Sequence, residues 1–352
     1  MHNKQFLAVL GLVLILTSGT AWAKEIKVPG DFPTITQAIN NASTGDVIKV
    51  AEGTYTENLT ITATLTLTEN LTLEGAGAEK TIIDGAAQSV PTIVIQSIKN
   101  VTVRGFTIQN GTRRGIDIIN RSTGIVIENN IVRNNRNLGL SAINQSEVKI
   151  FKNQIVDTVK ATAVASGRGL QVVDSQAVIS GNTIAKNAEI GIAIFSSKVE
   201  INDNQINENG AEGIILTPSA TTIATGTITG NTLNGNRAAG IVVTQSNVEI
   251  SKNKIANTQK PAGTTSSSVN GAGIVVRQDA RAKLSENMIT GSAGDGVAVF
   301  GAQAELTSNT IKDNQGCGVN GDRSAMIAGN NNEISGNMGG DLCGSAPASI
   351  KK

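Results

Sequence analysis

The sequence predicts an all-β protein, a single-stranded parallel β-helix (solenoid) of about 11–12 turns with a short capping helix at its N-terminal end. Three observations predict this fold. Short segments in which aliphatic and polar residues alternate, such as Val199 to Ile201, recur along most of the 352 residues and are typical of strands that send one row of side chains inward. An asparagine and a glycine return in step, with a base period of 22 to 24 residues. No helical stripe separates the strands, so each period corresponds to one solenoid turn of three strands.

Residues 1–23 have the composition of a signal peptide. Lys4 supplies the positive charge, an apolar core runs from Phe6 to Leu16, and Ala21-Trp22-Ala23 is an A-x-A cleavage site. No later apolar run approaches the roughly 20 residues of a membrane helix. We therefore expect no membrane span and an exported protein, periplasmic or extracellular, that begins at Lys24.

Residues 24–85 are expected to form an N-terminal cap and the first turns. Thr34 and Gln37 have the spacing of a capping box, and Gly45 ends the apolar run that follows. One face of this short helix is apolar, formed by Ile35, Ala38, Ile39 and Ala42. So short a helix is stable only when this face is buried, and the open end of a solenoid needs such a cover.

Residues 86–352 contain the repeats and a C-terminal cap. Asparagine tolerates the left-handed backbone of a sharp bend, and its amide both donates and accepts, so one asparagine per turn can form a buried ladder. The predicted ladder is Asn129, Asn153, Asn182, Asn204, Asn231, Asn253, Asn287, Asn309 and Asn332. The glycine marker opens the first strand of each turn at Gly115, Gly139, Gly169, Gly191, Gly213, Gly240, Gly273, Gly296 and Gly318.

The run VPGDFPTITQAINNASTGDVIKVAEGTYTENLTI, followed by LTLEGAGAEKTIIDG, resembles the entry segment of the pectin-lyase-like superfamily of right-handed parallel β-helices. The later repeats resemble the parallel β-helix repeats of that superfamily, so the resemblance covers nearly all of the mature chain. It implies a right-handed fold. It does not select one function, because lyases, hydrolases, esterases, epimerases and non-catalytic envelope proteins share the fold.

Composition excludes several kinds of function. The sequence has 29 basic and 28 acidic residues, and removing Lys4 with the leader leaves a formal net charge of 28 − 28, or zero. This balance gives no drive toward nucleic acid. The only histidine, His2, lies in the leader, so the mature chain lacks the catalytic histidine of polygalacturonases and alginate epimerases. The paired aspartate motifs of pectin methylesterases are also missing. We expect no cofactor and no metal.

In this superfamily, ligands bind on the outer face of the first strands, and the glycine marker gives the register of that face. Its outward residues lie two and four positions after each glycine. In the later turns they are mostly apolar and provide the predicted binding residues Ala193, Phe195, Ile215, Val242, Val275, Arg277 and Phe300. A patch of this kind usually marks an interaction. We expect it to be covered, either by the chain's own loops or by a protein partner.

The early turns contain the residues that an enzyme could use. Asp117, Arg136, Arg168 and Asp174 are the catalytic candidates, although a single aspartate on this face offers neither a carboxylate pair nor a calcium cage. Three insertions, at 157–168, 217–226 and 257–272, border the same face and are expected to wall any ligand groove.

Cys317 and Cys343 are expected to form a disulfide, because Cys343 falls about one period after Cys317 and export permits oxidation. The sequence favours a non-catalytic, exported protein that binds polysaccharide or another envelope component. Two alternatives stay open. One is a pectate-lyase-like or other polysaccharide-degrading enzyme acting on acidic polysaccharide, and the other is a protein-docking or adhesion scaffold.

Overall fold

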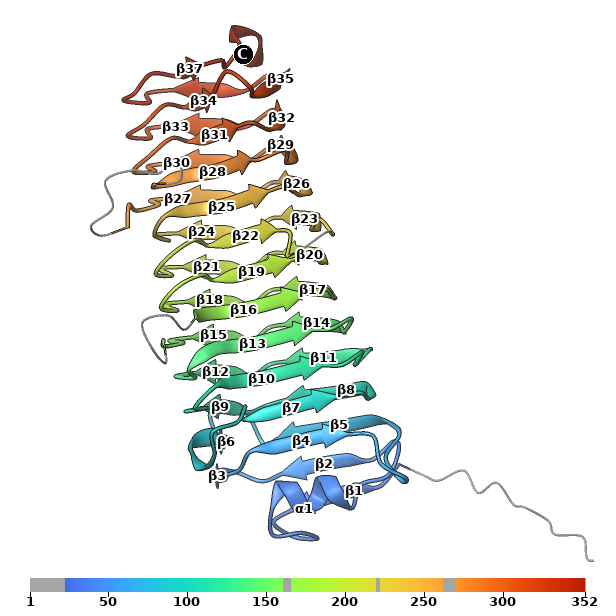
Figure 1. Ribbon diagram of the computed structural model, residues 1–352. Coiled ribbons are helices and arrows are strands. Elements are labelled where there is room, and N and C mark those ends of the chain that lie inside the picture. Colours follow the sequence, from blue (N-terminus) through green and yellow to red (C-terminus); the bar gives the residue numbers. More distant parts are fainter. Residues whose placement is uncertain (1–22, 161–165, 220–221, 262–269, 352) are drawn as a thin grey trace, which may run out of the picture.

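The computed structural model describes residues 23–160, 166–219, 222–261 and 270–351. These residues form a straight column of stacked turns, with helix α1 at one end and the C-terminus at the other (Figure 1). The predicted leader, residues 1–23, lies outside the described range except for Ala23. Parts of the three insertions, residues 161–165, 220–221 and 262–269, also lie outside it.

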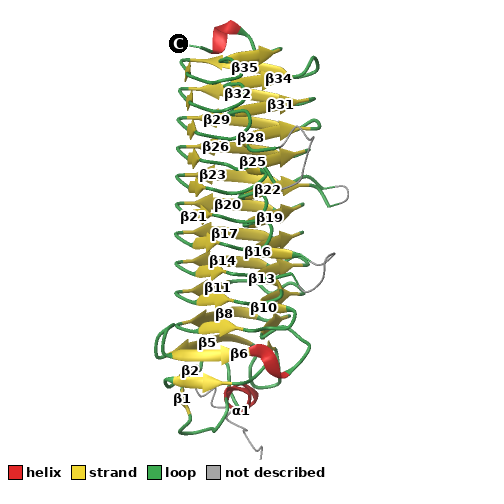
Figure 2. Cartoon of the chain, turned by 90° about the vertical axis from the view of Figure 1, so that its left-hand side faces the viewer, coloured by secondary structure: helices red, strands yellow, loops and turns green. Residues whose placement is uncertain are grey.

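Each turn contributes one strand to each of three parallel sheets, which run the length of the column (Figure 2). We name them the first-strand, second-strand and third-strand sheets after the order of their strands within a turn. The first-strand sheet has 12 strands: β4 Leu59–Thr62, β7 Ile93–Gln96, β10 Arg114–Ile119, β13 Asn137–Ile143, β16 Gly167–Val173, β19 Ile192–Phe195, β22 Ile214–Thr217, β25 Ala239–Thr244, β28 Ala272–Arg277, β31 Val297–Phe300, β34 Val319–Gly321 and β37 Leu342–Gly344.

The second-strand sheet has 13 strands: β1 Glu25–Val28, β2 Val47–Val50, β5 Glu69–Gly75, β8 Lys99–Arg104, β11 Ile125–Glu128, β14 Glu147–Phe151, β17 Gln176–Ser180, β20 Lys198–Asn202, β23 Thr225–Thr229, β26 Asn247–Ser251, β29 Arg281–Ser285, β32 Gln303–Thr307 and β35 Met326–Asn330. The third-strand sheet has 12 short strands: β3 Gly53–Tyr55, β6 Thr81–Asp84, β9 Thr107–Gln109, β12 Ile131–Arg133, β15 Gln154–Val156, β18 Thr183–Ala185, β21 Gln205–Asn207, β24 Thr232–Asn234, β27 Lys254–Ala256, β30 Met288–Thr290, β33 Thr310–Lys312 and β36 Glu333–Ser335.

The solenoid has about 13 turns, slightly more than the 11–12 expected. The difference arises at the N-terminal end, where β1 precedes the capping helix and pairs in parallel with β2, Glu25 opposite Val47. The sequence analysis assigned this segment to the cap. Its burial alternates along only four residues, which is too short for the period to stand out.

Both ends of the column are capped. Helix α1, Ile35–Asn40, is capped by Thr34, whose side chain accepts a hydrogen bond from the backbone N–H of Gln37 at 3.2 Å, as the capping pattern predicted. The carboxylate of Glu57 accepts hydrogen bonds from two further N–H groups of the first helical turn, those of Ile35 at 3.0 Å and Thr36 at 2.9 Å. Two 3₁₀ turns complete the helical content of the described residues, η1 Gly85–Ala87 and η2 Ala348–Ile350. At the C-terminal end, the carbonyl of Ile350 in η2 accepts from the side chain of Asn332 at 2.7 Å.

The core is a set of aliphatic columns parallel to the axis. The inward residues of β20, Val199 and Ile201, are almost completely buried, and Ile201 stacks between Ile179 and Ile228 of the neighbouring turns. Because the inward row of every turn meets the same row above and below it, one period-two pattern generates a continuous core.

The predicted asparagine ladder is present with one member changed. Eight side-chain amides in succession donate to the side-chain oxygen of the next asparagine along the axis, over 2.9–3.2 Å. The first member is Asn130. The predicted residue, Asn129, precedes it and is exposed.

The reason for the correction lies in the bend itself. Asn129 has a left-handed backbone with φ of 53°, and the residue before each later ladder asparagine is left-handed too, for example Lys152 with φ of 56° and Asp203 with φ of 55°. The ladder asparagines are not among the residues with positive φ. Their role is therefore to satisfy buried backbone groups, and the sequence interpretation wrongly assigned the left-handed conformation to them.

A second buried ladder lies five residues after the first, at the bend that follows the third strands. Its positions hold Asn135, Thr158, Asn187, Asn209, Asn236, Thr258, Ser292, Asn314 and Asn337. Asn187 donates to Asn209, and Asn209 to Asn236, both at 2.9 Å. This ladder also explains the glycine marker. A Cβ on Gly191 would lie 2.9 Å from the amide nitrogen of Asn209 and 2.7 Å from the carbonyl oxygen of Gly213.

The disulfide between Cys317 and Cys343 is confirmed. The two Cα atoms are 6.1 Å apart, and the bridge joins residues separated by 26 in the sequence. Cys343 lies in β37, the last strand of the first-strand sheet, and pairs with Asn320 of β34. The bond therefore ties the last turns of the column together.

Candidate functional site

The outer face of the first-strand sheet has the register that the glycine marker predicted. Asp117, Ser141, Gln171 and Ala193 stand in one column on successive strands. The same column continues through Ile215, Val242, Val275 and Ala298.

The apolar part of this face is closed. Ala193, Val242, Val275 and Ala298 are 0% exposed, although they lie on the outer side of the sheet. The last three pack with Ala239 and Ala272 into a hydrophobic cluster separate from the core, against which the half-buried Ile215 and Phe300 pack. The chain itself therefore buries these residues, whereas the other members of the predicted set are only half-buried. A ligand on this face would reach only the half-buried members of the predicted set, Phe195, Ile215, Arg277 and Phe300.

Asp117 is a satisfied structural carboxylate. Only 7% of the residue is exposed, the guanidinium of Arg114 lies 2.6 Å from one carboxylate oxygen, and the hydroxyl of Ser141 donates to the other. Arg114 stands one residue before the marker glycine, in an outer column that the sequence analysis did not consider. Each carboxylate oxygen of Asp117 therefore has a partner supplied by the protein itself.

The same outer column holds Arg168 and Glu212, one residue before Gly169 and Gly213. The guanidinium of Arg168 lies 5.2 Å from the ring centre of Phe195, a cation–π distance, and donates to the side chain of Gln171. Burial lowers the pKa of Arg168. For the acidic Glu212, burial has the opposite effect and raises the pKa. The nearby positive charges of Arg277 and Arg168 offset part of this rise.

The four catalytic candidates are not brought together. Arg136 precedes β13 and is exposed, whereas Asp174 follows β16, so these two lie at opposite edges of the first-strand sheet. The contacts of Asp117 are with Arg114 and Ser141, and those of Arg168 are with Gln171 and Phe195. In the described part of the chain, no group of three or more His, Cys, Asp or Glu side chains could hold a metal ion. No helix there is long and apolar enough to cross a membrane.

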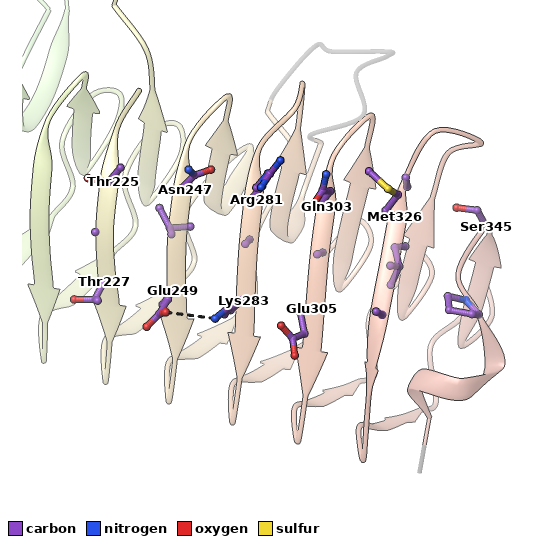
Figure 3. Close-up of a pocket in the computed structure, with 18 of the residues that line it drawn as sticks. Thr225, Thr227, Asn247, Glu249, Arg281, Lys283, Gln303, Glu305, Met326 and Ser345 are labelled. Carbon is purple, nitrogen blue, oxygen red and sulfur yellow. Dashed lines mark ion pairs between the residues drawn. The ribbon is translucent and has the colours of Figure 1, made fainter. Parts of the chain in front are cut away.

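A groove of about 1020 Å³ lies on a different face, the outer surface of the second-strand sheet (Figure 3). It runs across six strands, from β20 to β35, and ends beside Ser345 and Pro347 of the C-terminal cap. Two rows of outward side chains line it. One row holds Thr225, Asn247, Arg281, Gln303 and Met326, and the other holds Thr227, Glu249, Lys283 and Glu305.

The polar side chains of the groove are largely unengaged. Glu249 and Lys283 approach each other at 3.9 Å, and both side chains are about two-thirds exposed. Among the described residues, the side chains of Asn247, Arg281, Gln303 and Glu305 have no hydrogen bond or ion pair. Their donors and acceptors face solvent and are available to a ligand.

The N-terminal half of the same face is different because its charges neutralise one another. Arg104 lies 3.1 Å from Glu74 and 3.4 Å from Glu128, on the strands on either side of it. Hydrogen bonding to Glu74 raises the pKa of Arg104. Lys49 pairs with Glu25 at 2.9 Å. Among the described groove residues, the one ion pair is the longer contact of 3.9 Å between Glu249 and Lys283.

A second hollow, of about 990 Å³, lies at the bend between the first and second strands. Its polar groups are partly bonded to each other, since Arg121 donates to Gln145 at 2.9 Å and Asn144 to Asn120 at 3.4 Å. Asp174, one of the catalytic candidates, lines this hollow. It offers fewer free groups than the groove.

Sequence reasoning missed the groove because it read only the first-strand face. A signal was present: Asn247 and Glu249 alternate with the buried Val248 and Ile250, and Arg281 and Lys283 repeat the pattern. What the pattern could not supply is whether that outward row is hollowed or flat.

The fold and the repeat geometry define a parallel β-helix protein. The family model for the right-handed β-helix region matches residues 40–177, 91–255 and 224–350, and the chain belongs to this family. A cell surface glycoprotein of Methanothermus fervidus is 36% identical over 137 residues, which are 38% of this chain and 21% of that protein. The chain thus spans about a fifth of the length of this relative.

Two solved structures show the same fold at low sequence identity. The A-module of mannuronan C-5 epimerase AlgE4 from Azotobacter vinelandii superimposes with a TM-score of 0.60 at 15% identity, covering 90% of this chain and 93% of that one. The catalytic unit of a GH87 α-1,3-glucanase from Streptomyces thermodiastaticus has a TM-score of 0.55 at 16% identity, covering 88% and 67%. At these identities the likeness concerns the fold alone.

Proposed function

We propose that this protein is an exported, cell-surface β-helix that binds polysaccharide in the groove of the second-strand sheet and does not cleave it. The observation that carries the proposal is the groove's set of unengaged side chains, Asn247, Arg281, Gln303 and Glu305, on a face where Arg104, nearer the N-terminus, is ion-paired on both sides. Hydroxyl-rich ligands are recognised by hydrogen bonds to groups of this kind, and a rigid sheet holds the groups in place before binding.

Three further observations support the proposal. The disulfide fits an oxidising compartment outside the cytosol, and the sequence relative is a cell surface glycoprotein. The two structural relatives are named as enzymes of mannuronan and α-1,3-glucan. Against catalysis stands Asp117, whose two oxygens are both engaged. Against protein docking on the first-strand face stands the burial of its apolar residues within the chain.

The test measures binding and cleavage together. The protein comprising residues 24–352 is titrated with soluble neutral and acidic polysaccharides, and the same mixtures are assayed for new reducing ends and unsaturated uronates. We expect saturable binding of at least one polymer and no fragments above a buffer control.

Variants then locate the site. Arg281→Ala/Lys283→Ala removes two exposed groove cations and should weaken binding at least tenfold without lowering the melting temperature. Lys254→Ala is the matched control, because this exposed lysine lies in the third-strand sheet away from the groove. If the two variants bind the polymer equally well, the groove is excluded as the binding site. Polymer fragments released by the wild-type protein would exclude the non-catalytic function.

A further inference from the structure

The charges of the groove form a periodic pattern along the column. Glu249, Lys283 and Glu305 stand directly opposite one another on the consecutive strands β26, β29 and β32. The sign of the charge therefore alternates across these three strands (Figure 3), and the positions on either side, Thr227 and Ala328, are uncharged. Consecutive strands lie roughly 4.8 Å apart.

This spacing matters for a polymer that lies along the groove. Each sugar of an extended polysaccharide advances the chain by about the length of one pyranose ring, which is similar to the spacing between neighbouring strands. A polymer of uronic acids carries a carboxylate on every sugar, and a carboxylate placed beside Lys283 would lie only about one strand spacing from both Glu249 and Glu305. Like charges at such distances repel each other.

The second row of the groove gives the same result. Thr225, Asn247 and Gln303 of this row are uncharged donors and acceptors. Arg281 is the one charged residue of the row. The groove's basic residues are Lys198, Arg281 and Lys283, and its acidic residues are Glu249 and Glu305, so its formal charge is 3 − 2, or +1. A formal charge of +1 provides little electrostatic attraction for a polyanion.

We infer that the groove takes a single extended chain of an uncharged hexose polymer, lying parallel to the axis of the column. This inference rests on the proposed function and specifies its ligand. The six strands from β20 to β35 span five spacings, or roughly 24 Å, enough for about five or six sugars. Recognition is by hydrogen bonds to carboxylate, guanidinium and amide groups, because none of the described residues that line the groove is aromatic and could stack on a sugar.

The test compares two polymers that differ only in charge. Mannan and polymannuronate have the same backbone, with an alcohol at C6 in the first and a carboxylate in the second. We expect mannan to bind at least tenfold more tightly than polymannuronate, with an affinity that is nearly independent of salt, since no ion pairs with the ligand form. Tighter binding of polymannuronate that weakens with salt would overturn the inference. A preference for mannan that stays the same when groove residues are substituted would also overturn the inference.

A charge-removing variant provides the second arm. Glu249→Gln/Glu305→Gln keeps the size of both side chains and removes the repulsion, so it should raise the affinity for polymannuronate relative to mannan about tenfold. Glu147→Gln is the matched control, because this exposed glutamate lies on β14 of the same sheet, outside the groove, and it should leave that ratio near the wild-type value. An unchanged ratio in Glu249→Gln/Glu305→Gln would refute the role of the alternating charges. Binding of neither polymer class, by contrast, would refute the proposed function itself.

Discussion

The asparagine ladder gives the sharpest test of how the fold is held together, and Asn204→Ala is the substitution that probes it. The side-chain oxygen of Asn204 accepts from the backbone N–H and from the amide of Asn182, both at 2.9 Å. Its own amide donates to the carbonyl of Ile179 and to Asn231, again at 2.9 Å. Asn204 is 1% exposed, so water cannot replace these partners without opening the bend.

The expected loss follows from these contacts. The amide of Asn182 keeps two other acceptors, the carbonyl groups of Ile150 and Ser180. Its backbone N–H keeps none in the described structure and becomes a buried orphan, which costs about 1–3 kcal/mol, and the loss of the amide's own bonds adds about 1 kcal/mol. We therefore expect Asn204→Ala to lower the free energy of unfolding by about 2–4 kcal/mol.

The assay combines a global and a local measurement. Urea unfolding reports the shift of the midpoint, and amide hydrogen exchange reports the protection of the Asn182 N–H, because a repeat protein need not unfold in a single step. Gln205→Ala, one residue away and exposed, is the control and should change stability by less than about 0.5 kcal/mol. If both variants unfold alike and Asn182 stays protected, the ladder does not stabilise the bend as argued.

The start of the ladder can be checked in the same way. Asn130 accepts from the backbone N–H of Phe106 at 3.1 Å, whereas Asn129 supplies only the left-handed bend. We expect Asn130→Ala to destabilise the protein and Asn129→Gly, which keeps the left-handed conformation available, to be nearly neutral. The opposite order would restore Asn129 as the ladder residue.

Three further predictions concern the disulfide, the covered face and the half-buried carboxyl of Glu212. Cys343→Ala should lower stability by about 3 kcal/mol, because the bridge closes a loop of 26 residues, and two reactive thiols in the denatured, unreduced wild-type protein would contradict the bridge itself. Val242→Asp places an unpaired carboxylate at a position that is 0% exposed and should lower the melting temperature clearly; if Gln205→Asp, on the exposed row, lowers it as much, burial is not the cause. Burial raises the pKa of Glu212 above its ordinary value of 4.5, so the folded state binds this proton more tightly than the unfolded state. Its contribution is then greatest at low pH and falls as the pH rises above 4.5. Glu212→Gln should therefore have a higher melting temperature than the wild type at pH 7 and little difference at pH 4, and a constant difference across this range would refute the assignment.

The sequence by itself determined the architecture, because a solenoid is built from local rules that repeat. The inward rows follow from period-two alternation, as at Val199 and Ile201, and the outward columns follow from the glycine marker. The disulfide followed from the same period, since one repeat brings Cys343 to the turn next to Cys317.

Tertiary structure decided what depends on contacts between turns. Asn129 and Asn130 are neighbours of the same type, and only the stacking on Asn153 selects Asn130 for the ladder. Val242 lies on an outward row, yet the packing of its own chain buries it. The groove around Arg281 depends on how six strands, each a full turn apart, shape one surface and leave most of its polar side chains without a protein partner. Alternation within a strand fixes the side to which a residue points, but the exposure and the partners of that residue are set by segments 22 or more positions away in the chain.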